Sequence, residues 1–152
     1  MTAVQIPARD IILEVESPTP DTWLRVENLK NVTINRAENE ETADLTNYDS
    51  DGSYEQWIMQ RGASMALAGD ELKDHLTGAL QPGRGRVEQM AGEDKVGFDS
   101  IGRVRFRHPM DSQWKIWSAT FSVGETGGET NPVSAWAATI TKSGKTTLAA
   151  VA

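Results

Sequence analysis

The chain has 152 residues, a formal net charge of −7 at pH 7 and no cysteine. This length fits one domain over residues 1–152, and the lack of cysteine excludes a disulfide framework and a thiolate metal site. The acidity argues against a protein that grips nucleic acid by its phosphates, since that grip needs a clustered basic surface.

Short runs of alternating apolar and polar residues predict strands along most of the chain. Successive side chains of a strand point to opposite faces, so such runs build sheets with one apolar side. Together they predict a mainly β fold. The predicted strands are residues 11–16, 22–26, 32–35, 54–59, 64–68, 101–107, 114–123 and 133–142.

An acidic stretch lies between Arg36 and Arg61, with no Lys or Arg inside it. It is either a solvated loop or a segment that contacts another molecule. Asp51-Gly52 predicts a chain reversal, because glycine readily adopts positive φ.

One helix is expected at residues 70–81. Asp70 is a suitable cap, and Leu72, Leu76 and Leu80 recur at four-residue spacing to form one apolar stripe. The Pro82-Gly83 pair then predicts the end of the helix. Residues 87–90 either extend this helical region or lie outside it, and residues 91–97 are expected to form a loop.

The richest aromatic segment is residues 114–123. In an extended chain, Trp117, Ala119, Phe121 and Val123 share one face. This predicts an antiparallel pairing with residues 133–142, with Trp117 and Trp136 in the core or a subunit interface. Trp114 is out of phase and is expected to be exposed. Residues 143–152 are expected to form a polar turn and a C-terminal tail.

No catalytic, cofactor or metal site is predicted. The segment 144–147, Gly-Lys-Thr-Thr, echoes a phosphate-binding loop, but position 139 lacks the required glycine. Residues 49–52 resemble part of a calcium loop without its remaining ligands. His75 and His108 stand alone, and residues 1–12 lack the pattern of a signal peptide, so we expect a protein without a membrane segment.

Taken in order, these pieces resemble the major tail tube proteins of long-tailed bacteriophages. The resemblance covers nearly the whole chain, although no single motif in it is diagnostic. It lies in the opening meander through residues 32–35, the turn-rich stretch 45–53, the strand-like run 60–69, the short helix, and residues 114–123, 134–138 and 143–145.

The resemblance implies a β-sandwich or barrel with one flanking α-helix and a long protruding loop. It further implies a structural virion protein and no enzyme: subunits form hexameric rings, hairpins of neighbours pair into one continuous barrel, and the rings stack into a tube that delivers genomic DNA. Such a protein is made in the host cytoplasm, needs no cofactor and does not insert into membranes. Its partners are other copies and further tail proteins, such as the tape measure, terminator and distal tail proteins.

We expect the loop at residues 37–53 to reach a neighbouring subunit, because it is too long for a minimal hairpin. The candidate contact residues are Leu45, Tyr48, Asp49, Asp51, Tyr54 and Trp57. Acidic side chains would repel a passing duplex over about 8 Å at physiological salt. The candidate lumen or loop acids are Glu38, Glu40, Glu41 and Asp44.

The arginines at positions 103, 105 and 107 are expected outside the lumen or against acids of a neighbour. Two alternatives remain open. One is the tube of a phage-derived contractile injection system, and the other is a small carbohydrate-binding module that uses an exposed Trp114.

Overall fold

A computed structural model describes all of residues 1–152. The fold is mainly β, with one large antiparallel sheet ordered β2-β1-β7-β8-β9-β6-β3 and a separate hairpin, β4-β5. The main strands are β1 (Ile12–Glu16), β2 (Trp23–Arg25), β3 (Leu29–Asn35), β6 (Ser64–Asp70), β7 (Gly102–Arg107), β8 (Gln113–Val123), β9 (Ala135–Lys142) and β10 (Thr147–Ala150). The hairpin strands are β4 (Glu41–Asp44) and β5 (Gln56–Gln60), and short 3-10 turns lie at Ala8–Asp10, Tyr48–Ser50 and Gly97–Ser100.

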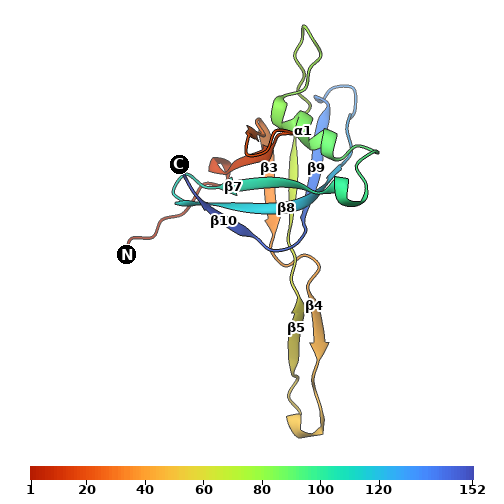
Figure 1. Ribbon diagram of the computed structural model, residues 1–152. Coiled ribbons are helices and arrows are strands. Elements are labelled where there is room, and N and C mark those ends of the chain that lie inside the picture. The colour runs from red at the N-terminus through yellow and green to blue at the C-terminus, as the bar shows by residue number, and fades with distance from the viewer.

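The long strand β8 joins the two halves of a sandwich. Its first half pairs with β7 and β10, and its second half, from Ala119 to Val123, pairs with β9. In Figure 1, β7 and β8 cross in front of β3 and β9. The sheet therefore folds over on itself, and the predicted pairing of β8 with β9 is confirmed.

The core lies between these halves and follows the predicted alternation. Trp117, Ala119 and Phe121 are buried on the inner face of β8, and Trp136 is buried on β9. The rings of Phe106 and Trp117 meet edge to face at 5.1 Å between centroids. The assignment of Trp117 and Trp136 to a packed interior is confirmed.

The helix predicted at residues 70–81 is wrong. Asp70 belongs to β6, and the segment after it forms a projecting loop closed by a bridge between Lys73 and Leu80. The carboxylate of Asp74 accepts the backbone N–H groups of Leu76 and Thr77, at 2.8 and 3.1 Å, and so favours a turn over a helix. The leucine stripe has no surface to cover, since Leu76 is exposed.

The helix is instead α1 (Pro82–Met90), beginning where the sequence predicted an end. Proline is favoured at the first helical position, because its missing N–H would be unpaired there anyway. The side chain of Gln81 caps the helix by accepting the backbone N–H of Arg84 at 3.0 Å. Residues 87–90 are thus helical, and α1 flanks β1, β2 and β8. No helix of the structure is long and apolar enough to cross a membrane.

Arg84 anchors α1 to the sheet through a buried side chain that is only 2% exposed. Its guanidinium donates to the backbone carbonyls of Glu27, Asn28 and Asp70 and lies 4.8 Å from the centroid of the Trp136 ring. Burial lowers the pKa of Arg84, and the nearby charge of Asp70 opposes that shift. One side chain therefore joins the helix, the turn after β2 and the end of β6.

Trp114 is buried, so the prediction that it is exposed is wrong. It lies on the outer face of β8, where the guanidinium carbons of Arg105 and Arg107 are 4.1 and 4.8 Å from its ring centroid. Flat guanidinium groups stack well on indole, so the arginines of β7 cover the ring. The sequence pattern did not predict the burial of Trp114, because only one face of this strand was expected to be apolar.

The same arginine row is paired within the chain. Arg105 lies 2.5 Å from a carboxylate oxygen of Glu14, and Arg103 lies 2.6 Å from one of Glu16. Both acids come from β1, which is directly paired with β7. No acid of a neighbour is needed to balance these two arginines.

The C-terminal residues also differ from the prediction, because part of the expected tail is the strand β10. It pairs with β8 from Thr147 opposite Ile116 to Ala150 opposite Gln113. β9 pairs only with the second half of β8, so an edge of the first half is left for β10 to cover. The sequence of residues 147–150 does not by itself predict a strand, since its pairing depends on the unpaired edge of β8.

Candidate assembly surface

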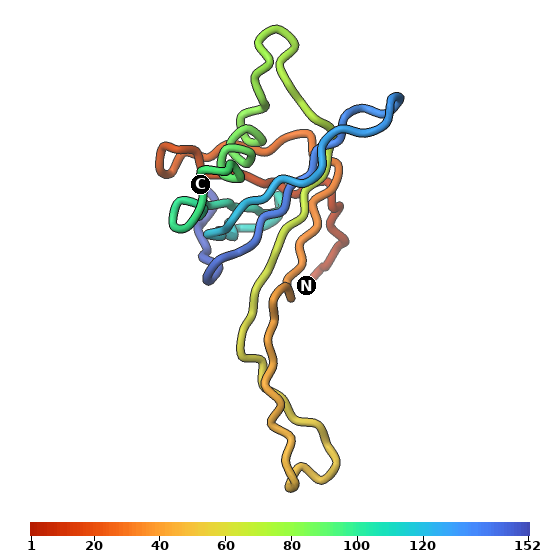
Figure 2. The backbone as a smooth tube through the Cα atoms, turned by 90° about the vertical axis from the view of Figure 1, so that its right-hand side faces the viewer, coloured from red at the N-terminus to blue at the C-terminus, as the bar shows by residue number.

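The most prominent feature of the molecule is an arm formed by residues 36–62, which contains the hairpin β4-β5. It projects away from the sandwich in both views of the backbone (Figures 1 and 2). Its strands pair only with each other. The predicted protruding loop is therefore longer and more ordered than expected, because it includes the strand β5 as well as residues 37–53.

Side-chain hydrogen bonds hold the root of the arm. The carboxylate of Glu38 accepts from Asn35 and Ser64 at 2.9 and 3.3 Å, which links the ends of β3 and β6. Glu40 pairs with Arg61 at 3.3 Å. Gly62 permits the close crossing, because a Cβ there would lie 2.5 Å from the carbonyl oxygen of Glu38. These contacts fix the direction in which the arm leaves the body.

The tip is also held by local bonds. The side chain of Asn47 accepts a hydrogen bond from the backbone N–H of Asp49 at 2.8 Å, and the backbone N–H of Asn47 donates to the hydroxyl of Ser50 at 3.1 Å. Asp51 follows in the left-handed region at φ 51°, so the expected reversal is confirmed. Nearby, the N–H of Thr46 donates to Asp44 at 2.9 Å and lowers the pKa of that carboxyl group.

Large apolar side chains of the arm face solvent. Tyr54 and Trp57 are each 65% exposed, Met59 is 64% exposed, and Tyr48 is fully exposed. A lone two-stranded hairpin is marginally stable in water, and an exposed apolar group of this kind marks a contact surface. The arm has the composition of an interface without a partner inside its own chain.

The structure brings all ten candidate residues together on the arm. Leu45 is half-buried within the hairpin, whereas the other contact candidates are exposed. Glu38 and Glu40 already bond within the root, and Glu41 and Asp44 face solvent. The contact candidates are Leu45, Tyr48, Asp49, Asp51, Tyr54 and Trp57, and the acidic candidates are Glu38, Glu40, Glu41 and Asp44.

The main sheet has free edges as well. β2 pairs only with β1, and β3 pairs only with β6. No backbone hydrogen bond joins β3 to any other element. Unpaired strand edges present rows of N–H and C=O groups that readily pair with another chain. The sheet is thus open to extension along β3, whereas α1 partly covers β2, where the side chain of Gln81 donates to the carbonyl oxygen of Arg25 at 2.8 Å.

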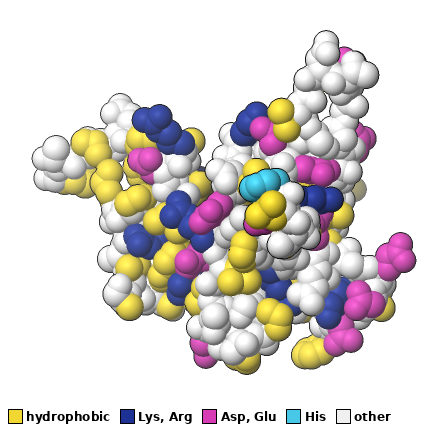
Figure 3. Space-filling view, turned by 90° about the horizontal axis from the view of Figure 1, so that it is seen from above, with side chains coloured by type: hydrophobic (Ala, Val, Ile, Leu, Met, Phe, Trp, Pro, Cys, Tyr) yellow, Lys and Arg dark blue, Asp and Glu magenta, His cyan; other side chains and the backbone are white.

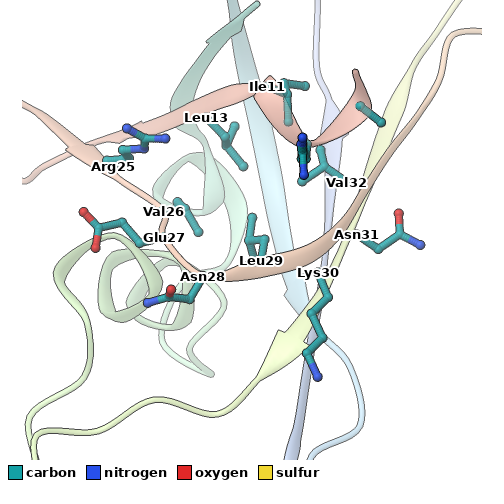
Figure 4. A pocket seen from close by; sticks show the side chains of 12 residues that line it. Ile11, Leu13, Arg25, Val26, Glu27, Asn28, Leu29, Lys30, Asn31 and Val32 are labelled. Carbon is teal, nitrogen blue, oxygen red and sulfur yellow. The ribbon is translucent and has the colours of Figure 1, made fainter. Parts of the chain in front are cut away.

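A cavity of about 590 Å³ lies beside the free edge of β3, between that strand and the N-terminal segment. Figure 4 shows Leu13, Val26, Leu29 and Val32 pointing into it, while Lys30 and Asn31 point away. Six of the twelve lining residues are hydrophobic, and the other six are polar or charged. The cavity offers an opening for an added segment and no set of groups for catalysis.

Titratable groups do not gather into a reactive centre. No group of three or more His, Asp or Glu residues could hold a metal ion. Seen from above, basic and acidic side chains alternate over the body without a continuous patch of either sign (Figure 3). This face lacks the basic stripe that a protein needs to grip a phosphate backbone.

Comparisons with solved structures identify the fold. The chain is similar to a chain in the tail of an empty GTA particle solved with C6 symmetry, with a TM-score of 0.69 and 20% identity over 96% of this chain and 100% of that one. A chain in the virion of a native gene transfer agent particle gives a TM-score of 0.66 and 16% identity over 96% and 100%.

A third similar chain lies in the sheath-tube complex of an extracellular contractile injection system in its extended state, with a TM-score of 0.55 and 11% identity over 97% and 93%. No protein-family model and no curated protein matches the sequence. The fold is therefore one that occurs in tail and injection particles.

Sequence reasoning missed two features of this surface. β4 is short and polar, so nothing in its residues marks a strand. A group of basic side chains around a pocket at the root of the arm also escaped notice, because these residues come from distant parts of the chain. The only available signal was indirect: in an acidic chain, Lys115 and Lys142 lie in alternating strands with no acid beside them.

Proposed function

We propose that this chain is the subunit of a phage-type tail tube, in which hexameric rings of identical copies stack into a hollow cylinder that delivers double-stranded DNA. The observation that carries the proposal is the projecting arm, with its exposed Trp57 and Met59 and no partner inside the chain. The fold shared with a gene transfer agent tail of C6 symmetry supports the ring.

The open edge of β3 supports the same assembly. A repeated contact between unlike surfaces either closes a ring or extends a filament. Copies that add a strand to the free edge of β3 would close a ring, and copies that meet through the arm would stack. The subunit would be a virion tail component made in the host cytoplasm, with the other tail proteins as end partners and no enzymatic role.

The net charge of −7 suits a channel for DNA. Acidic side chains on the wall would keep phosphates from binding, since like charges repel within about 8 Å at physiological salt. Glu41 and Asp44 are the exposed candidates for such contacts with the lumen. Arg103 and Arg105 do not oppose this arrangement, because Glu16 and Glu14 pair with them.

A second candidate is the tube of a contractile injection system, which the fold similarity to a sheath-tube complex favours. Such a tube differs from a phage tail tube in what passes through it, whereas the proposed assembly of the subunits is the same. The carbohydrate-binding module loses its basis, because Trp114 is buried beneath Arg105 and Arg107 and offers no open stacking face.

Negative-stain microscopy and sedimentation of the purified chain test the proposal. We expect rings or tubes at high concentration. A variant in which Asn-Gly replaces residues 37–62 joins β3 to β6 directly, and it should give folded subunits that do not polymerise. Normal tubes from this variant, or a wild-type chain that stays monomeric at every concentration, would refute the assignment.

A further inference from the structure

A second cavity, of about 500 Å³, opens at the end of the sandwich from which the arm leaves. Ile34, Arg36 and Ala63, at the root of the arm, line one side of it. Its floor is apolar and includes the core side chains Phe106 and Trp117. We call it the basic pocket, because its rim carries Arg36, Arg107, His108, Lys115 and Lys142, with Asp111 as the one acid.

The cations of the basic pocket lack acidic partners. None of Arg36, Arg107, Lys115 and Lys142 forms a salt bridge, and Asp111 accepts the backbone N–H of His108 at 3.0 Å. The Nε of Arg107 and the Nδ1 of His108 are buried without any hydrogen-bond partner. The guanidinium of Arg107 is occupied, since it lies over the Trp114 ring and donates to the carbonyls of His108 and Pro109. Arg36, Lys115 and Lys142 are therefore the cations of the pocket that are available to an acidic partner.

The tip of the arm has the complementary chemistry. Tyr48 is fully exposed, and Asp49 and Asp51 beside it are exposed and form no salt bridge. An aromatic ring suits an apolar floor, and carboxylates suit a rim of Lys and Arg. The tip cannot reach the basic pocket of its own chain, because the pocket lies at the root of the arm and the arm projects away from the body (Figure 1).

We propose that the tip at residues 48–51 of one copy docks in the basic pocket of a second copy, an inference that rests on the proposed tube. The arm from Arg36 to Tyr48 spans at most about 40 Å at roughly 3.3 Å per residue, because residues 36–39 form a turn. A body of about 125 residues has a radius of gyration near 14 Å, hence a diameter of about 36 Å.

The arm and the body are therefore of comparable length, so a shift of one copy along the arm by the length of the arm moves it by about one body. Because the basic pocket lies at the root, this shift brings the pocket of one copy level with the tip of the next. The tip and the pocket are different surfaces, so the contact repeats in one direction and builds an open stack. The length of the arm then limits the axial repeat to at most about 40 Å.

Disulfide capture tests the pairing in the full chain, which has no cysteine of its own. A Tyr48→Cys, Lys115→Cys variant should give a ladder of linked copies on oxidation, because each bond must join two molecules whose Cα atoms come within about 7 Å. Tyr48→Cys, Lys95→Cys is the matched control, since Lys95 lies outside the pocket lining. The control should give no ladder.

Charge reversal tests the chemistry. Arg36→Glu with Lys115→Glu, two exposed side chains without salt bridges, should raise the concentration needed for stacking by about tenfold or more, because facing like charges oppose association. Asp49→Lys with Asp51→Asn should do the same, and Asn tolerates the left-handed backbone at position 51. Combining all four changes should restore tubes, and Lys95→Glu should leave them intact.

The outcomes separate the two proposals. Wild-type tubes without a ladder, or tubes unaffected by the pocket changes, overturn the pairing and leave the tube standing. A wild-type chain that forms no tube overturns both. Binding of fluorescent duplex DNA that Arg36→Glu with Lys115→Glu abolishes would make the basic pocket a phosphate site, and the pairing would be wrong.

Discussion

Replacing Arg84 by methionine should destabilise the subunit by about 3 kcal/mol. The change leaves the carbonyl oxygens of Glu27, Asn28 and Asp70 without their charged donor, at about 1 kcal/mol each. The lost cation–π contact with Trp136 adds about 1 kcal/mol, and relief from burying a charge offsets a similar amount.

The expected loss corresponds to a fall in melting temperature of about 6–12 °C for a chain of this size. Urea unfolding, followed by tryptophan fluorescence and circular dichroism at a concentration where subunits are unassembled, measures it. Arg84→Lys should recover part of the loss, because lysine keeps the charge but lacks the planar fork that reaches several carbonyls.

Arg86→Met is the matched control on the same helix. The guanidinium of Arg86 donates to one backbone carbonyl, that of Glu16 at 2.9 Å, and to the side chain of Gln89. We expect a loss of about 1 kcal/mol for this variant. If Arg84→Met costs no more than Arg86→Met, the view that Arg84 fastens the helix to the sheet is incorrect.

Three further predictions concern the arm and the helix. Trp57→Ser should abolish tubes in negative stain while changing the free energy of unfolding by less than about 0.5 kcal/mol, since the side chain is 65% exposed; a large loss of stability would show that it packs within the subunit. Gly83→Ala should cost about 2 kcal/mol or more in urea unfolding, because the added Cβ would overlap the carbonyl oxygen of Arg25. Hydrogen bonds from Thr46 lower the pKa of Asp44 in the folded chain, so the ionised carboxylate stabilises the fold at pH values above the ordinary pKa of 3.8, and this stabilisation is lost as the pH falls through the lower folded pKa. The Thr46 amide signal in NMR should therefore titrate below pH 3.8, and Asp44→Asn should remove that transition.

The strands were the most predictable part of the fold. Val104 and Phe106 alternate with arginines in β7, and the burial of these two residues follows that alternation. The helix failed because a four-residue leucine spacing is only a weak signal when no surface faces it. Asp74 and Gly78 favour a turn locally, and Pro82 begins a helix as readily as it ends one.

The two halves of the proposed contact differ in how far a sequence can reveal them. The tip is local in the chain, so its acids and Tyr48 were recognisable in advance. The basic pocket depends on register, since Lys115 lies opposite Phe106 only after β7 and β8 have paired. Its remaining basic residues come from the ends of β3, β7 and β9, and no spacing rule links those positions.

The bonded root of the arm has a kinetic consequence. Because Glu38 bridges the ends of β3 and β6 within the lone subunit, the arm is already aimed before any copy meets another. A preorganised arm of this kind loses little conformational entropy on docking. Polymer growth should then be limited by how often subunits collide in the right orientation, with no slow refolding step to delay each addition.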